Sequence, residues 1–158
     1  MDTATRGRIL TNWRQYVIDE ARTYKGTPYL HKGRVKGVGV DCGGMIYQIF
    51  NAFLPLAPFP KSYPPDWALH RENEIYLKFM EPYVMEVGGP RKGGIAMFKI
   101  GRNFAHGAIC TEKRTFIHAW GRNQAGGVVE SRLPFFTIGN NGKPREVKYY
   151  DLDPKWLS

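Results

Sequence analysis

Residues 39–50 read GVDCGGMIYQIF, a stretch that places a cysteine where a glycine-rich loop meets an apolar run. Over residues 42–53 the apolar side chains recur at helical spacing, and a proline-rich segment follows. The pattern predicts a helix with Asp41 as its N-cap and Cys42 in its first turn. Because the free amides and the dipole at a helix start stabilise a thiolate, we expect the pKa of Cys42 to be lowered and its thiol to be nucleophilic.

Two glycines, Gly43 and Gly44, directly follow the cysteine. Each lowers the stability of a helix by about 1 kcal/mol relative to alanine. A purely structural helix has little reason to carry both, so the pair favours a helix start that a sheet or a substrate approaches closely. A small thiol that simply packs well is the alternative, and this stretch alone favours the reactive role only slightly.

The composition is typical of one folded domain that spans residues 1–158, with 42% hydrophobic and 14% aromatic residues. No apolar stretch approaches the roughly 20 residues needed to cross a bilayer. The N-terminal segment lacks the apolar run of a signal peptide, so we expect neither a membrane span nor export by the secretory route. Two cysteines are too few for a disulfide scaffold.

The chain is basic, with 23 Lys and Arg against 14 Asp and Glu and a net charge of +9. Such a charge suits anionic partners: nucleic acid, anionic cell-wall polymers or an acidic protein surface. The basic residues are scattered, however, and the sequence has no long basic arm and no recognised nucleic-acid-binding motif. We therefore expect no binding to nucleic acid.

Helical patterns come first along the chain and strand patterns follow, an order typical of the α+β class. Helices are expected over residues 3–24, 42–53 and 66–80, the last with Asp66 as its N-cap. Strands are expected over residues 95–100, 104–111, 115–120, 128–133 and 146–150.

A nucleophilic Cys42 needs a base, and two histidines lie in the predicted hairpin NFAHGAICTEKRTFIHAW. Strand alternation puts Phe104, His106, Ala108 and Cys110 on one face. A turn centred on Glu112 would pair residues whose numbers sum to 224, so that His106 faces His118 directly with Cβ atoms about 5 Å apart. Two imidazoles in that arrangement suit a base and an orienter that holds the base in the right tautomer.

Other readings of these residues remain open. Cys42, His106 and His118 are a possible zinc ligand set, but metal-binding spacings such as HExxH and CxxC are absent, so we expect no metal. Cys110 is expected to be a core or hairpin-end thiol. His31 lies in a basic loop and is expected to be solvated.

Two segments, GTPYLHKGRVKGVGVDCGGMIYQIF and AHGAICTEKRTFIHAW, resemble the NlpC/P60 family of papain-like cysteine peptidases. The resemblance implies a papain-like fold with N-terminal helices packed on a central antiparallel sheet. It implies that Cys42 is the nucleophile, that His106 is the base and that His118 orients the base. Tyr29 would line the oxyanion site through its hydroxyl, together with the backbone N–H of Cys42.

Within this family the chain resembles cell-wall peptidases of tailed phages and gene transfer agents, through PPDWALHRENE, KGGIAMFKIG and IHAWGRNQAGGVVESRL. That branch implies a place in the virion tail, tail-tip or baseplate partners, and action in the cell wall or periplasmic space. Trp67 and His70 are assigned to the substrate groove, with a buried helix-start cluster as the alternative. Three further residues are assigned to substrate binding: Asp41, Gly43 and Ala105.

The sequence departs from the family pattern at three places. Gly43 replaces the usual Ser or Thr, and Gly94 replaces the Asp of a P-G-D turn. Both changes are expected to alter local hydrogen bonding and not the chemistry. An insertion at residues 54–83 lengthens the spacing between cysteine and histidine and is expected to reshape the groove.

The resemblance implies a thiol peptidase that cleaves the D-γ-glutamyl–diamino acid amide bond of peptidoglycan stem peptides without a metal or organic cofactor. One alternative is an amidase or acyltransferase on the same fold. The other is a structural tail-tip module that retains a peptidase fold. The presence of Cys42, His106 and His118 argues against the structural module, because a scaffold needs none of them.

Overall fold

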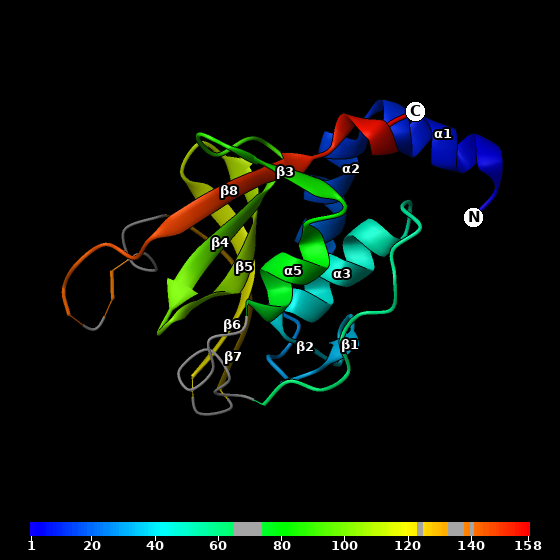
Figure 1. Cartoon of the computed structure of the whole chain (residues 1–158). Helices are drawn as coiled ribbons and strands as arrows, with labels where there is room; N and C mark the ends of the chain where they lie inside the picture. Colours follow the sequence, from blue (N-terminus) through cyan, green and yellow to red (C-terminus); the bar gives the residue numbers. More distant parts are fainter. Residues whose placement is uncertain (65–73, 123–124, 133–137, 140) are drawn as a thin grey trace.

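A large antiparallel sheet with helices on one face organises the computed structural model, which describes residues 1–64, 74–122, 125–132, 138–139 and 141–158 (Figure 1). Helices precede most of the strands, so the predicted α+β class is confirmed. The strand order in the described sheet is β3-β8-β4-β5-β6-β7. Its strands are β3 (Val84–Val87), β4 (Ile95–Ile100), β5 (Asn103–Glu112), β6 (Thr115–Arg122), β7 (Ala125–Arg132) and β8 (Val147–Leu152).

The five predicted strands are therefore confirmed to within a few residues, whereas β3 was missed. β3 is a four-residue edge strand that pairs only with β8 among the described strands. Its residues are only partly buried or exposed, so it lacks the apolar alternation that identifies a strand in sequence.

The first predicted helix is wrong in one respect, because it is two helices: α1 (Thr3–Thr11) and α2 (Trp13–Thr23). The break is at Asn12, whose φ and ψ of −130° and 40° are not helical and whose N–H bonds to the Ile9 carbonyl. Asparagine tolerates such a break because its short polar side chain competes with helical hydrogen bonding. α2 can then turn Trp13 and Val17 into the core.

The remaining elements are two helices, a pair of short strands and a C-terminal 3-10 helix. The predicted helix from Cys42 is α3, which ends at Asn51, two residues earlier than expected. Of the predicted helix over residues 66–80, only α5 lies among the described residues; Asp66, Trp67 and His70 lie outside them. The other described elements are β1 (Arg34–Val35), β2 (Gly39–Val40), α5 (Ile75–Met80) and a short 3-10 helix, Pro154–Trp156.

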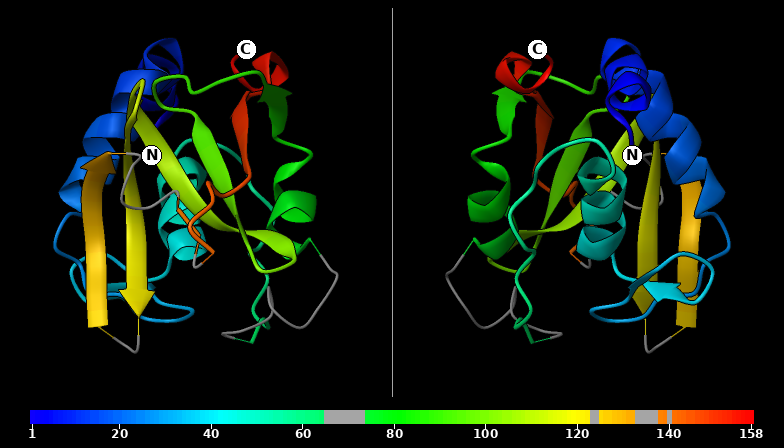
Figure 2. Two further views of the ribbon diagram at one scale, coloured as in Figure 1. Left: turned by 90° about the vertical axis from the view of Figure 1, so that its left-hand side faces the viewer. Right: turned by 90° about the vertical axis from the view of Figure 1, so that its right-hand side faces the viewer.

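α2 and α3 lie together on one face of the sheet (Figure 2). α3 approaches β5 closely at Gly107, where a Cβ would lie 2.6 Å from Ile46 Cδ1. The apolar residues between helices and sheet are almost completely buried, among them Val17, Met45 and Ile109. This close helix–sheet contact fixes the start of α3 against β5. No helix among the described residues is long and apolar enough to span a membrane.

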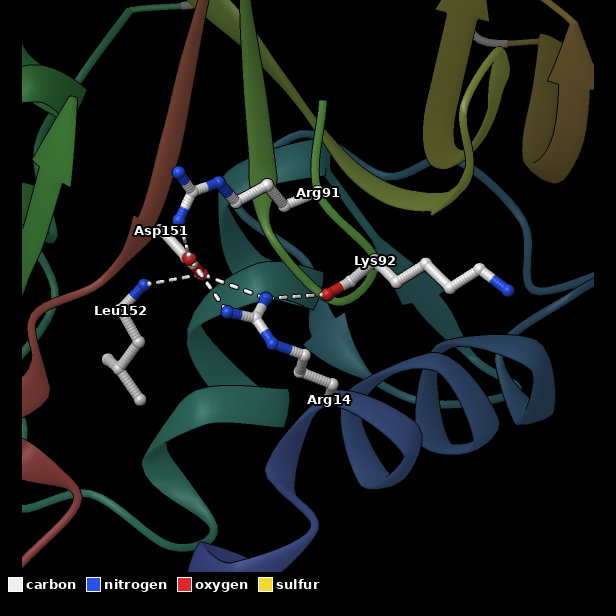
Figure 3. Close-up of polar contacts among 5 residues, drawn as sticks. All are labelled: Arg14, Arg91, Lys92, Asp151 and Leu152. Atoms are coloured by element: carbon white, nitrogen blue, oxygen red, sulfur yellow. Dashed lines mark hydrogen bonds and ion pairs between the residues drawn. The ribbon is translucent and has the colours of Figure 1, made fainter. Parts of the chain in front are cut away.

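The buried carboxylate of Asp151 links α2 to strand β8 (Figure 3). Arg14 of α2 binds Asp151 of β8 through two N–H donors at 3.0 and 2.7 Å, and Arg91 adds a third at 3.1 Å. The same Arg14 donates to the Lys92 carbonyl, at 2.9 Å. Desolvation opposes ionisation of Asp151, but these bonds outweigh it and lower its pKa.

Candidate active site

The start of α3 has the N-cap that the sequence predicts. Asp41 Oδ1 accepts a hydrogen bond from the Gly44 N–H at 2.7 Å, while Oδ2 accepts from the Lys32 N–H at 2.8 Å and from the Tyr63 hydroxyl at 2.6 Å. The residue is 2% exposed. Three donors from three chain segments thus hold this carboxylate, which fixes the loop, the helix start and the segment around Tyr63 together.

The two glycines after the cysteine are explained by packing. A Cβ at Gly43 would lie 2.9 Å from Phe59 Cζ and 3.0 Å from Tyr76 Cζ, so these aromatic rings occupy the place of a side chain. A Cβ at Gly44 would lie 2.3 Å from the Gly33 carbonyl oxygen. The inference that a purely structural helix has little reason to carry both glycines is therefore wrong, because close packing requires them, and they are no separate sign of reactivity.

A β-bulge at Ala105 places the first histidine. Phe98 of β4 pairs with His106, but the next residue, Lys99, pairs with Phe104, so Ala105 is the extra residue. Because of this bulge Phe104 packs in the helix-side core, whereas Cys110 belongs to a second apolar cluster that contains no helix residue. The prediction that they share a face is wrong. The carbonyl oxygen of Ala105 lies 3.7 Å from Cys42 Sγ and accepts its hydrogen.

His106 and His118 are hydrogen-bonded, although not in the predicted register. Glu112 pairs with Thr115, so the turn is centred between Lys113 and Arg114 and not on Glu112. After a register shift between Glu112 and Cys110, Cys110 pairs with Phe116, a sum of 226 and not 224. Continuing this pairing makes the histidines diagonal neighbours on one face. His106 Nε2 still lies 3.1 Å from His118 Nδ1, and His118 Nε2 lies 2.9 Å from Ser131 Oγ.

Trp120 covers the histidine pair. Its ring meets that of His106 edge-on, with centroids 5.0 Å apart and planes at 89°. It also lies 6.4 Å from the ring of His118. The two imidazoles are 6% and 2% exposed, so the contact between their nitrogens is shielded from water.

A cavity of about 190 Å³ brings the predicted reactive residues together. Cys42, His106 and Tyr29 all line it, whereas His118 lies behind His106. Tyr29 fits here because Gly121 has no side chain: a Cβ there would lie 2.3 Å from the Tyr29 ring. The lining residues are Tyr29, His31, Asp41, Cys42, Tyr63, Tyr76, Ile100, Ala105, His106, Ala119, Trp120 and Gly121.

Burial, and not the helix start, dominates the charge state of the thiol. Desolvation and the neighbouring Asp41 raise the pKa of Cys42 to about 12, against smaller opposing effects of backbone amides. The expected lowering of this pKa is thus wrong. Desolvation also lowers the pKa of His106 well below 6.5, aided by His118 and Arg145, and lowers that of His118 to about 4. At neutral pH the resting site therefore holds an uncharged thiol and two uncharged imidazoles.

Tyr29 is a hydrogen-bond donor at any physiological pH. Burial, and secondarily Cys42 and Asp41, raise the pKa of its phenol to about 12. The hydroxyl therefore keeps its proton in the same cavity as the thiol. Such a donor is suited to a developing oxyanion.

Several residues of this cavity were missed by sequence reasoning. His31 was expected to be solvated, but it is half-buried and its Nε2 lies 3.0 Å from the Tyr63 carbonyl oxygen. Tyr63 and Tyr76 come from the 54–83 insertion, which was expected to reshape the groove, although neither residue was singled out. Trp120 was expected only to share a strand face with His118.

The zinc alternative finds no site in the part of the chain that the structure describes. No three His, Cys, Asp or Glu side chains there are grouped so that they could hold a metal ion. Cys110 is buried in the second apolar cluster, as predicted for a core thiol. Gly94 lies where a Cβ would be 2.8 Å from the Tyr150 carbonyl oxygen, which explains why no aspartate stands there.

No family model matches the chain, and no curated protein matches its sequence. Among solved structures, the crystal structure of the NlpC/p60 domain of the peptidoglycan hydrolase SagA is similar, with a TM-score of 0.56 at 17% sequence identity. The match covers 85% of this chain and 96% of that one. The chain therefore has the fold of an NlpC/p60 domain, and the fold expected from the resemblance is confirmed.

Proposed function

We propose that this chain is a thiol peptidase that cleaves an amide bond in peptidoglycan stem peptides. The observation that carries the proposal is the constellation around one cavity: a cysteine at a helix start, a histidine that lines the same cavity, and a second histidine bonded to the first at 3.1 Å. The fold shared with the NlpC/p60 domain of a peptidoglycan hydrolase supports the substrate class.

The chemistry follows from the uncharged resting state. His106 takes the proton from Cys42 Sγ as the sulfur attacks the amide carbonyl, so no stable thiolate is needed beforehand. The Tyr29 hydroxyl and the Cys42 backbone N–H stabilise the oxyanion. The C–N bond then breaks as His106 gives its proton to the leaving amine. Water, deprotonated by His106, attacks the thioester; the C–S bond breaks, the acyl product leaves as an acid, and His106 returns the proton to Cys42 Sγ.

His118 and Trp120 act on the base. The imidazolium that forms on His106 is disfavoured by burial. A hydrogen bond from His106 Nε2 to His118 Nδ1 offsets part of that penalty. The Trp120 ring shields this bond from water. The base is therefore held in one orientation and is charged only during turnover.

The proposed scissile bond is D-γ-glutamyl–diamino acid, and the proposed location is the tail of a phage or a gene-transfer-agent-like particle. Both rest on the sequence resemblance and on no measured distance. The proposed substrate contacts are Asp41, Gly43 and Ala105. The carboxylate of Asp41 already accepts three hydrogen bonds from the protein.

The test is digestion of peptidoglycan fragments from several bacterial types, with products read by mass spectrometry. Wild-type protein is expected to release new stem-peptide fragments that mark the bond cut, and Cys42→Ala protein none. A folded, reduced wild-type protein that cleaves no fragment would overturn the proposal. Products in which the acyl group has moved to another amine would indicate a transferase instead.

A further inference from the structure

The hydrogen-bond chain behind the thiol does not end at the second histidine. His118 Nε2 lies 2.9 Å from the hydroxyl oxygen of Ser131, on β7, where Ser131 pairs with Phe116 of β6. His118 is 2% exposed, so a water molecule cannot easily replace this partner. The chain thus runs from His106 through His118 to Ser131, with both nitrogens of His118 engaged.

The direction of these bonds decides whether His106 can act as a base. Each uncharged imidazole carries one N–H. If His118 Nε2–H donates to Ser131, then His118 Nδ1 accepts from His106 Nε2–H, and His106 Nδ1 is the nitrogen that takes the thiol proton. If Ser131 donates to His118 Nε2, both histidines are reversed and His106 Nδ1 already carries a proton.

The charged state of the site selects the first direction. Once His106 is protonated, both its nitrogens donate, so His118 Nδ1 has to accept and His118 Nε2 has to carry the proton. Ser131 then has to accept. A resting chain that already has this direction needs no proton rearrangement when the base is charged, which is the form of preorganisation that lowers a catalytic barrier.

We propose that Ser131 is a positioning residue whose Oγ accepts the Nε2 proton of His118 and so holds His106 in the tautomer that acts as a base. The catalytic role of Ser131 rests on the proposed function, whereas the histidine tautomers are a property of the free protein and can be measured without a substrate. The low pKa values of both histidines are consistent with this role, because only uncharged rings have a tautomer to fix.

The first test is ¹⁵N NMR of the histidine rings in the wild-type protein at neutral pH, which distinguishes protonated from unprotonated ring nitrogens. The expected result is a protonated Nε2 and an unprotonated Nδ1 on both His106 and His118. An unprotonated Nε2 on His118 would overturn the proposal. This measurement needs neither a substrate nor a variant.

The second test compares Ser131→Ala with Ser131→Thr, which keeps a hydroxyl. Ser131→Ala is expected to mix the tautomers of both histidines and to lower kcat about 5-fold at unchanged KM, as loss of one hydrogen bond of about 1 kcal/mol implies. Ser131→Thr is expected to restore the wild-type spectrum. Unchanged histidine spectra in folded Ser131→Ala protein would contradict the proposal.

A matched control is Thr111→Val, which removes another buried hydroxyl bond, that from Thr111 Oγ1 to the Thr115 carbonyl at 3.0 Å. It is expected to leave the histidine spectra as they are. Failure of the proposed function has a different signature, a protein with the expected tautomers that cleaves no stem peptide.

Discussion

His106 and His118 are diagonal neighbours on β5 and β6, and their Nε2 and Nδ1 atoms lie 3.1 Å apart. The diagonal arrangement leaves Trp120 to cover the ring of His106 edge-on. The pair is thus both hydrogen-bonded and shielded from water.

The pH dependence of the thiol should reveal the uncharged resting state. Because burial raises the pKa of Cys42 to about 12, its rate of alkylation by iodoacetamide is expected to keep rising with pH beyond pH 8. A thiolate–imidazolium pair would instead give a constant rate between about pH 6 and 8. Peptide mapping identifies the alkylated cysteine, and a constant rate at Cys42 would contradict the uncharged state.

Folding stability should also fall on mild acidification. The folded-state pKa values of His106 and His118 lie below the ordinary 6.5, so the unfolded chain binds protons first as the pH falls. Stability is therefore full above pH 6.5 and is lost progressively toward pH 4. Urea unfolding across this range measures it, and a His118→Asn variant should show a shallower loss. An equally steep loss in that variant would show that His118 does not cause the loss of stability on acidification.

Removal of the Tyr29 hydroxyl tests the oxyanion site. Tyr29→Phe keeps the ring against Gly121 but loses the donor, so kcat is expected to fall about 100-fold with little change in KM. Tyr150→Phe, on β8, is the matched control and should keep wild-type kcat. A Tyr29→Phe variant with unchanged kcat would remove this hydroxyl from the mechanism.

Two glycine substitutions should have opposite effects on stability. Gly44→Ala puts a Cβ 2.3 Å from the Gly33 carbonyl oxygen and is expected to destabilise the fold by about 2 kcal/mol, since the backbone must move. Gly7→Ala meets nothing within 4 Å and lies in α1, so it should stabilise by about 0.5–1 kcal/mol. Thermal unfolding measures both, and similar effects of the two changes would contradict the packing described here.

The buried Asp151 should make stability depend on pH at the acid end. Its pKa is lowered in the folded protein, so its contribution is present above the ordinary value of 3.8 and is lost as the pH falls through the lower folded value. Asp151→Asn is expected to cost about 2 kcal/mol at neutral pH and progressively less as the pH falls below 3.8. Asp153→Asn, on the surface, should have a small effect, and an equal cost of Asp151→Asn at neutral and at acid pH would refute the account.

Local patterns predicted most of the fold. Asp41 caps α3 as expected, and the apolar alternation located the strands of the central sheet, because both depend on residues close together in sequence. The registers of β5 with β4 and with β6 could not be predicted, because an extra residue in a strand leaves no mark in composition. The bulge at Ala105, opposite β4, and the shift before Glu112, opposite β6, are both of this kind. The turn between β5 and β6 also lies beyond the expected centre at Glu112, since Glu112 pairs with Thr115.

The gathering of the predicted residues around one cavity could be predicted from the sequence, but their charge state could not. Cys42 and His106 do line one cavity, with Tyr29. Whether a helix start lowers the thiol pKa depends on how much water the rest of the fold removes, and that is set by packing from distant segments. Tyr63 and Tyr76, which line the same cavity from the insertion, have no sequence signal that leads to the thiol.

The most direct test of the central claim uses the two cysteines of the chain as a matched pair. Cleavage of one defined stem peptide is measured with reduced Cys42→Ala and Cys110→Ala proteins, each shown to be folded by circular dichroism. We predict that Cys42→Ala loses all measurable turnover while Cys110→Ala, altered in a core cluster at a residue that does not line the cavity, keeps wild-type kcat. Turnover that survives in Cys42→Ala would contradict the assignment of this thiol as the nucleophile.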